Sequence, residues 1–316
     1  MGSIISVGVS SCLLGNLVRY DGGHKRDRYV TETLSNYFRF VPVCPEVECG
    51  LSVPREAMRL VGDASDPRLI TFRSGVDYTE QMKNFCERKM SELEKEDLCG
   101  FIFKKDSPSS GLYRVKIYHP SGNAVRKGRG LFASAVANFF PLLPLEEEGR
   151  LQDAHLRENF IEKVFSYKRW KDFMQSNPDY KKLIIFHTRQ KLLIMAHSPK
   201  HYSSLGKLVA QGKETSKDQL LFTYEKLFME ALSVFSTIKK NTNVLYHIMG
   251  YFKSNLTRDE KAELLEIIGD YSRSLVPLTV PLTLINHYVR KYEVSYLKNQ
   301  VYLSPHPSEL MLRNHV

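Results

Sequence analysis

Three cysteines lie in polar stretches of the first third of the chain. Cys12 occurs in the segment "SSCLLGNLVRYDGGHK", and Cys44 and Cys49 lie close together in "PVCPEVECGL". Thiolates are preferred ligands of zinc and of iron–sulfur clusters. The Cys-x4-Cys spacing is not that of a zinc knuckle, whereas a [4Fe–4S] cluster held by three cysteines would leave one iron open to a soft sulfur ligand. The alternative is that these cysteines are small packing residues at strand ends.

Acidic and hydroxyl side chains accompany the cysteines. Glu46 could deprotonate an attacking water, or it is a surface acid or helix cap. Asp21 in "RYDGG" could bind the edge of a substrate, or it is an ordinary turn residue. The stretch "KKDSPSSGLYR" supplies hydroxyl groups that could contact a substrate or position water, although Ser107 could instead be a helix cap or part of a Ser-Pro turn, and it supplies a glycine that permits close approach of the backbone. These residues are Ser107, Ser109, Ser110 and Gly111.

Short apolar runs of strand length precede these polar stretches. We expect strands over residues 4–10, 38–43, 68–72 and 99–104, and helices over about 27–37 and 79–95. Such alternation predicts an α/β domain with a mainly parallel sheet. Ligands bind at the carboxyl ends of parallel strands, so the three polar stretches are expected to converge on one rim. Cys86 and Cys99 fall on apolar positions and are expected in the core.

The second half of the chain has a helical pattern instead. After the segment "LPLEEEGRLQD", helix-length stretches with apolar residues three and four apart follow one another to the end of the chain. Thr257 and Glu260 form a predicted capping box at the start of one of these helices. The sequence thus predicts two domains, an α/β domain at 1–165 and an all-α domain at 166–316.

Positive charge is concentrated in the helical half. Residues 1–166 contain 23 Lys and Arg against 22 Asp and Glu, whereas residues 167–316 contain 22 against 13. A basic surplus favours a polyanionic partner, nucleic acid first, although a solvated lysine-rich surface is the alternative. Two candidate RNA-contacting strips are Arg189, Lys191, Lys200, Tyr202 and Lys207, and Lys239, Lys240, Lys253, Arg258 and Lys261.

Three histidines in the helical half allow more than one interpretation. His187, His197 and His201 lie in or near one predicted helix, where they could bind a metal, contact RNA or pack between helices.

The chain has no apolar stretch long enough to cross a membrane, and its first residues resemble a strand rather than a signal peptide. We therefore expect a cytoplasmic protein whose thiols stay reduced.

The polar stretches carry a family resemblance. "SSCLLGNLVRYDGGHK", "PVCPEVECGLSVPREAMRLVG" and "GFIFKKDSPSSGLYRVKIY" resemble the motifs of the TudS-like thiouracil desulfidase family, in order, over roughly residues 4–150. The later segment "FHTRQKLLIMAHSPKHYSSLGKLVA" resembles the YbgA-like helical domain that is often fused behind that module. Together the two parts resemble the RudS type of tRNA thiouridine desulfidase.

The resemblance implies a cofactor and a reaction. Family members hold a [4Fe–4S] cluster through three cysteines, the fourth iron takes the thiocarbonyl sulfur of a base, and water attacks the ring carbon. The base leaves in its oxo form and the sulfur leaves as sulfide. By position, Cys12 and Cys44 match two ligand cysteines, Glu46 matches a carboxylate, and Ser107 matches a hydroxyl placed for proton transfer and substrate contact.

One departure from the family pattern concerns the third ligand. Single-domain members usually read "SPSCG" where this chain reads "SPSSG", and Ser110 cannot replace a soft thiolate. Cys49 is the nearby thiol that could fill the gap, if the segment from Pro45 to Gly50 turns back on itself.

The expected function is desulfuration of 4-thiouridine, and possibly of 2-thiouridine, in tRNA. In this interpretation the helical half binds phosphates while the target nucleotide is extruded into the α/β domain. One alternative is an enzyme for free thiouracil-type bases or nucleosides, in which the helical domain serves dimerisation. A second is a non-catalytic RNA-binding stress protein that has lost its cluster, given Ser110.

Overall fold

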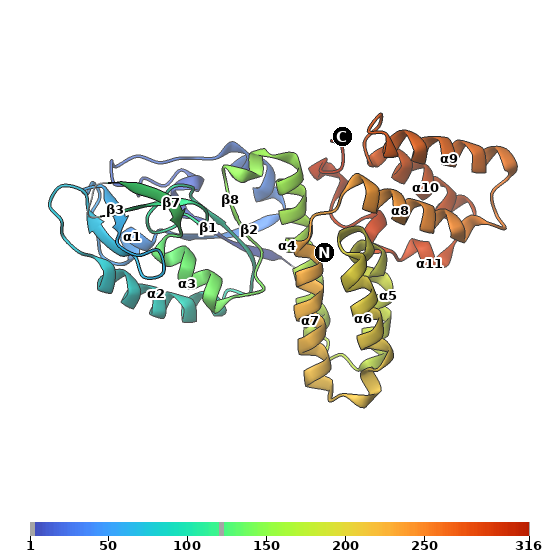
Figure 1. The fold of residues 1–316 in the computed structure, drawn as a ribbon, viewed down its shortest axis with the longest axis horizontal. Coiled ribbons are helices and arrows are strands. Elements are labelled where there is room, and N and C mark those ends of the chain that lie inside the picture. The colour runs from blue at the N-terminus through green and yellow to red at the C-terminus, as the bar shows by residue number, and fades with distance from the viewer. Residues whose placement is uncertain (1–3, 120–122, 316) are drawn as a thin grey trace. The chain divides into compact units, whose positions relative to one another are not determined.

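A computed structural model describes residues 4–119 and 123–315 (Figure 1). The chain divides into two compact units, Met1–Leu156 and Arg157–Val316. The first unit combines strands with helices and contains a parallel sheet, and the second is helical. The predicted fold class, α/β followed by all-α, is therefore confirmed. Among the described residues, no helix is long and apolar enough to cross a membrane.

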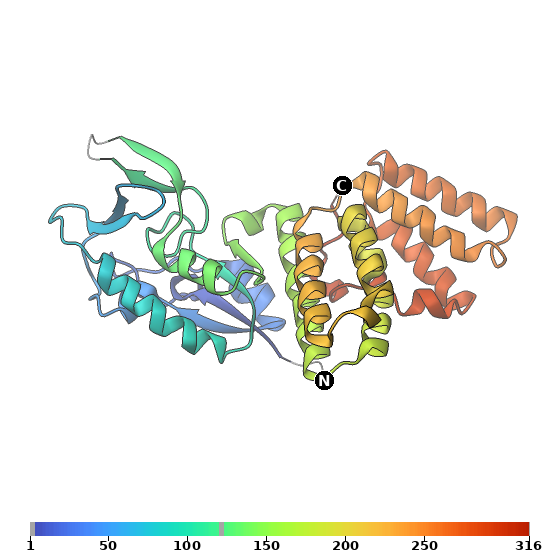
Figure 2. The same cartoon turned by 60° about the horizontal axis from the view of Figure 1, so that its bottom comes forward.

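The parallel sheet has the strand order β2-β1-β5-β8. Its strands are β1 (Ile5–Ser10), β2 (Phe38–Val43), β5 (Leu98–Phe103) and β8 (Leu145–Glu147). β1 and β5 are buried along their whole length, which explains their continuous apolar sequences. The helices α2 (Thr79–Glu94) and α3 (Leu131–Phe139) lie side by side (Figure 2), and Phe132 of α3 contacts the aromatic rings of Phe101 and Phe103 on β5.

A second, mixed sheet was not predicted from the sequence. Its order is β4-β3-β6-β7, and its strands are β3 (Met58–Val61), β4 (Arg68–Thr71), β6 (Val115–Tyr118) and β7 (Ala124–Gly128). The strand expected at 68–72 belongs to this sheet, where it runs antiparallel to β3. The physical reason is the short connection between β3 and β4, because a parallel pairing needs a crossover of a dozen residues or more.

The segment expected as a helix over 27–37 is irregular. It consists of a π-helical turn, Tyr29–Thr33, followed by a 3-10 turn, Leu34–Asn36. The side chains of Thr31, Ser35 and Asn36 each donate a hydrogen bond to the carbonyl four residues earlier. Such side-chain bonds compete with the regular backbone ladder and distort helices.

The second unit is built from helices around an aromatic core. They are α4 (Ala154–Gln175), α5 (Tyr180–His197), α6 (Pro199–Ala210), α7 (Lys217–Ser233), α8 (Ile238–Met249), α9 (Arg258–Ser272), α10 (Thr279–Lys291) and α11 (Ser295–Lys298). Trp170 packs against Phe186, Tyr224 and Phe228. The capping box of Thr257 and Glu260 is present at the start of α9, as predicted.

Buried charges tie the end of the chain into the helical unit. Arg313 donates to Glu162 Oε1 at 2.9 Å and to the Tyr302 carbonyl at 2.6 Å. The other oxygen of Glu162 lies 3.1 Å from Nε2 of His197. The side chains of Arg313 and Glu162 are only 7% and 2% exposed. The ion pairs hold the pKa of Glu162 below its usual range even though burial alone would raise it.

The histidines singled out from the sequence have separate partners. His187 on α5 lies 3.1 Å from the hydroxyl of Tyr224, and burial lowers the pKa of His187 to about 4. His197 ends α5 and contacts Glu162, whereas His201 lies on α6 and contacts the hydroxyl of Ser198. The three histidines thus have structural contacts in the helical unit.

Candidate active site

A cavity of about 380 Å³ lies at the carboxyl ends of β1, β2 and β5, within the first unit. The polar stretches that follow these strands form its wall, so they converge on one rim as parallel strands require. Of the residues predicted from the sequence to form the site, six line the cavity: Cys12, Cys44, Glu46, Ser107, Ser109 and Ser110.

Cys12 and Cys44 are the thiols of this cavity. Cys12 lies in the 3-10 turn Ser11–Leu14 directly after β1, and Cys44 follows β2 and precedes α1 (Pro45–Glu48). Burial raises the pKa of the Cys12 thiol to about 11, opposed by the ammonium of Lys104 and reinforced by Cys44. Burial also raises the pKa of Cys44, and hydrogen bonding to the backbone of Val47 opposes it. Burial thus disfavours the thiolate form of both side chains, and binding of a metal as thiolates would release protons.

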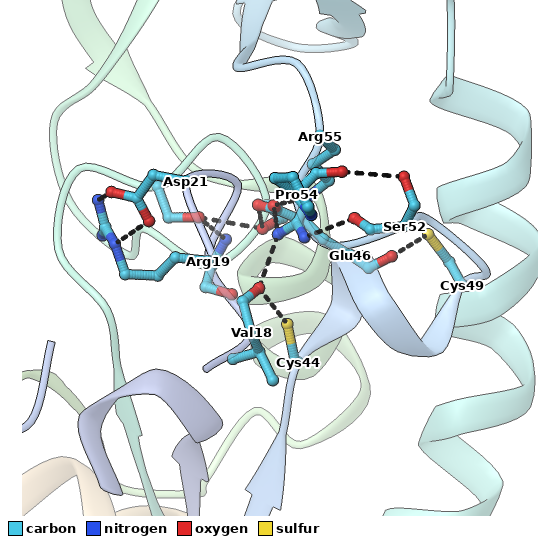
Figure 3. A network of polar contacts seen from close by, with 12 residues as sticks. Val18, Arg19, Asp21, Cys44, Glu46, Cys49, Ser52, Pro54 and Arg55 are labelled. Carbon is cyan, nitrogen blue, oxygen red and sulfur yellow. Dashed lines mark hydrogen bonds and ion pairs between the residues drawn. The ribbon is translucent and has the colours of Figure 1, made fainter. Parts of the chain in front are cut away.

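Cys49 lies outside the lining of the cavity. It caps the end of α1, and its Sγ lies 3.2 Å from the carbonyl oxygen of Glu46 (Figure 3). Its own carbonyl accepts a hydrogen bond of 2.7 Å from Gln81 on α2. Burial is the main cause that raises the pKa of Cys49. On the α2 side its thiol neighbour is Cys86, whose pKa burial raises to about 12, with a smaller contribution from Cys49.

Glu46 belongs to a polar chain along the cavity wall. One of its carboxylate oxygens forms an ion pair with Arg55, whose Nε donates at 3.0 Å (Figure 3). The other oxygen accepts a hydrogen bond of 2.7 Å from the hydroxyl of Ser109. The hydroxyl of Ser107 lies 3.0 Å from that of Ser109. A carboxylate, two hydroxyls and a guanidinium thus form one continuous hydrogen-bonded path.

Two cations of the site were missed by the sequence interpretation. Arg55 holds Glu46 and also donates to the Val18 carbonyl at 3.0 Å, which connects two loops of the rim. Lys104 lines the cavity, forms an ion pair with Glu148 and partly opposes the rise that burial causes in the pKa of Cys12. The sequence signal that could have identified Arg55 and Lys104 was their position inside the motif stretches. Neither residue has a characteristic spacing to another functional residue.

The remaining predicted residues lie around the cavity rather than in its lining. Asp21 is exposed, forms an ion pair with Arg19 at 3.3 Å and accepts a hydrogen bond from the backbone N–H of Gly23. This hydrogen bond, together with the one from Arg19, lowers the pKa of Asp21. Gly111 is buried, and a Cβ at this position would lie 2.4 Å from the Val115 side chain and 2.7 Å from the Ser107 carbonyl. Because glycine has no Cβ, the loop at Gly111 can pack closely against Val115 of β6.

The donor chemistry of the cavity fits an iron–sulfur cluster in part. Cys12 and Cys44 present two thiols to one space, which suits a thiophilic metal group. Within residues 4–119 and 123–315, however, no group of three or more His, Cys, Asp or Glu side chains is placed to hold a metal ion. In this conformation Cys49 contacts the backbone of Glu46 instead of facing the cavity.

Comparison with known proteins finds a different family model in each of the two units. A family model described as 2-thiouracil desulfurase matches residues 7–148, and a model described as a protein of unknown function (DUF1722) matches residues 191–307. The protein YbgA of Escherichia coli is 33% identical over 133 residues, which cover 42% of this chain and 79% of YbgA. This chain belongs to the TudS-like/YbgA-like two-domain proteins. The protein YbbK of Bacillus subtilis is 31% identical over 108 residues, or 33% of this chain and 71% of YbbK.

The TudS-like part also resembles a solved structure. The [4Fe-4S]-dependent thiouracil desulfidase TudS matches with 27% sequence identity over 47% of this chain and 93% of that chain, with a TM-score of 0.38. The cavity, with Cys12, Cys44 and Glu46, lies within the residues that the desulfurase family model matches. This part of the chain is therefore a thiouracil desulfurase-like domain.

Proposed function

We propose that this TudS-like/YbgA-like protein removes the sulfur of 4-thiouridine or of 2-thiouridine in tRNA by hydrolysis. The observation that carries the proposal is the cavity in which two thiols, the buried Cys12 and the half-buried Cys44, share one wall with the polar chain of Glu46. Thiols supply a site for a soft metal group, and the carboxylate supplies a base for water. The desulfurase family model, which spans the same residues, supports carbon–sulfur chemistry at this site.

The protein's own residues account for the proton steps. Glu46 accepts a proton from the water that attacks the ring carbon, and Arg55 holds its carboxylate in place. Ser109 and Ser107 extend the hydrogen-bonded path along the wall, so a proton can move to the departing sulfur. The carbon–sulfur bond breaks, a carbon–oxygen bond forms, and the products are the oxo base and hydrogen sulfide without a change of oxidation state.

A [4Fe–4S] cluster bound by Cys12 and Cys44 would supply an iron that polarises the thiocarbonyl sulfur. For the third ligand we propose Cys49, which would have to turn from its contact with the Glu46 carbonyl towards the cavity. Ser110 lines the cavity, but a hydroxyl is a poor donor to such a cluster.

The helical unit supplies cations for the tRNA backbone in this proposal. Arg189, Lys200 and Lys207 are exposed, as are Lys239, Lys253, Arg258 and Lys261. Lys240 is used within the fold instead, because its ammonium donates to the carbonyls of His197 and Phe235. Exposed lysines and arginines that neutralise phosphates release counterions, so binding should weaken steeply with added salt.

The function is tested by anaerobic reconstitution with iron and sulfide, followed by nucleoside analysis of thiolated tRNA after incubation with the protein. We expect thiouridine to be replaced by uridine, with release of sulfide, and the rate to fall as salt is added. Conversion of free thiouracil with no conversion of tRNA would favour the small-molecule enzyme. A protein that binds neither iron nor sulfide would contradict the desulfidase proposal.

The third ligand is tested by iron and acid-labile sulfide content per chain. We expect Cys49→Ser to lose most of its iron, and Cys86→Ser, the buried neighbour on α2, to keep it. Adding Ser110→Cys to the Cys49→Ser variant should restore iron, because the new thiol would line the same cavity. Wild-type iron content in Cys49→Ser would show that Cys49 is not a ligand.

A further inference from the structure

A second hollow, of about 330 Å³, lies on the mixed sheet of the first unit. Met58, Asp106 and Pro108 line both this hollow and the cavity, so the two spaces adjoin. Residues of β3, β6 and β7 form much of its wall. The chemistry proposed for the cavity uses none of the side chains that line this hollow but not the cavity.

The hollow carries a row of cations across adjacent strands. Lys116 on β6 pairs in register with Arg126 on β7, and Arg59 on β3 precedes Leu60, which pairs with Ile117. Arg59, Lys116 and Arg126 therefore occupy neighbouring positions on one face of the sheet. Like charges directly opposite each other destabilise a sheet, so such a row favours an anionic partner. Asp106, which pairs with Arg126 at 3.1 Å, is the one acid among the described residues of the lining.

Aromatic rings lie beside these cations. The guanidinium of Arg59 lies 4.8 Å from the ring centre of Phe72 and 5.3 Å from that of Tyr118. Phe72 is 54% exposed, so part of its ring is accessible to a partner. The Nε of Arg59 is buried and has no hydrogen-bond partner among the described residues. The hollow thus offers flat surfaces for stacking next to positive charge.

We propose that this hollow binds a nucleotide next to the thiolated one, as part of a single-stranded RNA segment that runs from the cavity across the mixed sheet. Phosphates lie against Lys116 and Arg126, and a base stacks on Phe72 and Tyr118. The inference rests on the proposed function, because it explains how a site of this kind selects a polynucleotide over a free base. Its evidence is independent of the thiols, since it uses only the sheet.

The charge contribution is tested by fluorescence anisotropy of the full chain with a labelled, unmodified oligouridylate of about eight nucleotides, over a range of salt. We expect Lys116→Ala to weaken binding and to lower the slope of log affinity against log salt by about 0.7, as one lost phosphate contact predicts. Lys127→Ala is the matched control, because Lys127 is the exposed neighbour of Arg126 on β7 and does not line the hollow. Equal effects of the two variants would overturn the inference.

Stacking is tested separately with Phe72. We expect Phe72→Ala to weaken oligouridylate binding about tenfold without changing the salt slope, and Phe72→Tyr to restore it. Unchanged binding by Phe72→Ala would overturn the stacking role. Thermal melting of each variant shows whether a loss of binding comes from unfolding.

These outcomes separate the inference from the proposed function. The oligouridylate carries no sulfur, and its binding is measured without turnover. If thiolated tRNA is desulfurated but the sheet variants bind like the wild type, the function stands and the inference fails. If the variants lose binding and the wild type with iron and sulfide bound releases no sulfide from thiolated tRNA, the hollow binds RNA but the desulfidase function fails.

Discussion

The two units each bury an arginine–glutamate pair, but the pairs differ in what else touches the carboxylate. In the helical unit, both oxygens of Glu162 are taken, one by Arg313 and one by His197. In the α/β unit, Arg55 holds one oxygen of Glu46, and the other accepts a hydrogen bond from Ser109 at the wall of a cavity. The same two residue types therefore lie in a closed core in one unit and beside an open cavity in the other.

Burial of an ion pair does not by itself indicate function. A buried pair whose hydrogen bonds are all satisfied is costly to break and offers nothing to a substrate. A pair beside an open space, with hydroxyl groups that can exchange protons, can do chemistry. The cavity of about 380 Å³, rather than the pair, distinguishes the α/β unit.

The largest effect is expected at Glu46. Glu46→Gln keeps an oxygen to accept from Ser109 but removes the base, so kcat should fall about 10²- to 10⁴-fold. Steady-state kinetics with the reconstituted enzyme measures this fall. Glu87→Gln is the matched control, since Glu87 is exposed on α2 and does not line the cavity. A kcat within tenfold of wild type for Glu46→Gln would show that Glu46 is not the base.

At Glu162 we expect a loss of stability instead. Glu162→Gln leaves the buried charge of Arg313 without this partner, so the free energy of unfolding should fall by about 3 kcal/mol. Urea unfolding followed by fluorescence measures the change, because the single tryptophan, Trp170, is buried in the helical unit. Turnover of free thiouracil at low temperature should be unchanged. A stable variant with reduced turnover would break the distinction between the two pairs.

A smaller, pH-dependent effect is expected at His187. Burial lowers the pKa of His187 to about 4 in the folded chain, below the usual value, so between these two pKa values only the unfolded chain binds the proton. The stability due to this group is present above about pH 6.5 and is lost as pH falls towards 4, by at most about 3 kcal/mol. Fluorescence-detected urea unfolding at several pH values measures it.

The control for His187 is the exposed His247. His187→Gln should lose stability less steeply on acidification than the wild type, and His247→Gln should follow the wild-type curve. Parallel curves for wild type and His187→Gln would mean that this histidine does not control the acid sensitivity of the helical unit.

The rim of the parallel sheet could be predicted because its signals are local. Apolar runs mark β1, β2 and β5, and the polar residues follow directly, so the placement of Cys12, Cys44 and Glu46 at one cavity required only the parallel order of the strands. The long helices α4 and α5 could be predicted from their periodicity in the same way.

The rest depends on contacts between distant segments. The mixed sheet pairs β3 with β6, which lie far apart in the chain and are only four residues long, too short to show a pattern. The break between α7 and α8 is also not marked by the apolar periodicity: α7 ends at Ser233 and Thr237 caps α8, and a short non-helical segment separates them. Arg55 was missed because its ion pair with Glu46 forms only when the loop between the two residues turns back, and no sequence spacing indicates this.

The close approaches at Gly111 and Gly130 make the wall of the cavity sensitive to the backbone of the serine loop. A Cβ on Gly130 would lie 2.4 Å from the backbone of Ser109, and a Cβ on Gly111 would lie 2.7 Å from the carbonyl oxygen of Ser107. A side chain at either position would therefore displace the loop that carries these two hydroxyls, although the substitution itself would remove no polar group. The shape of the wall thus depends on two residues that contribute no side chain to it.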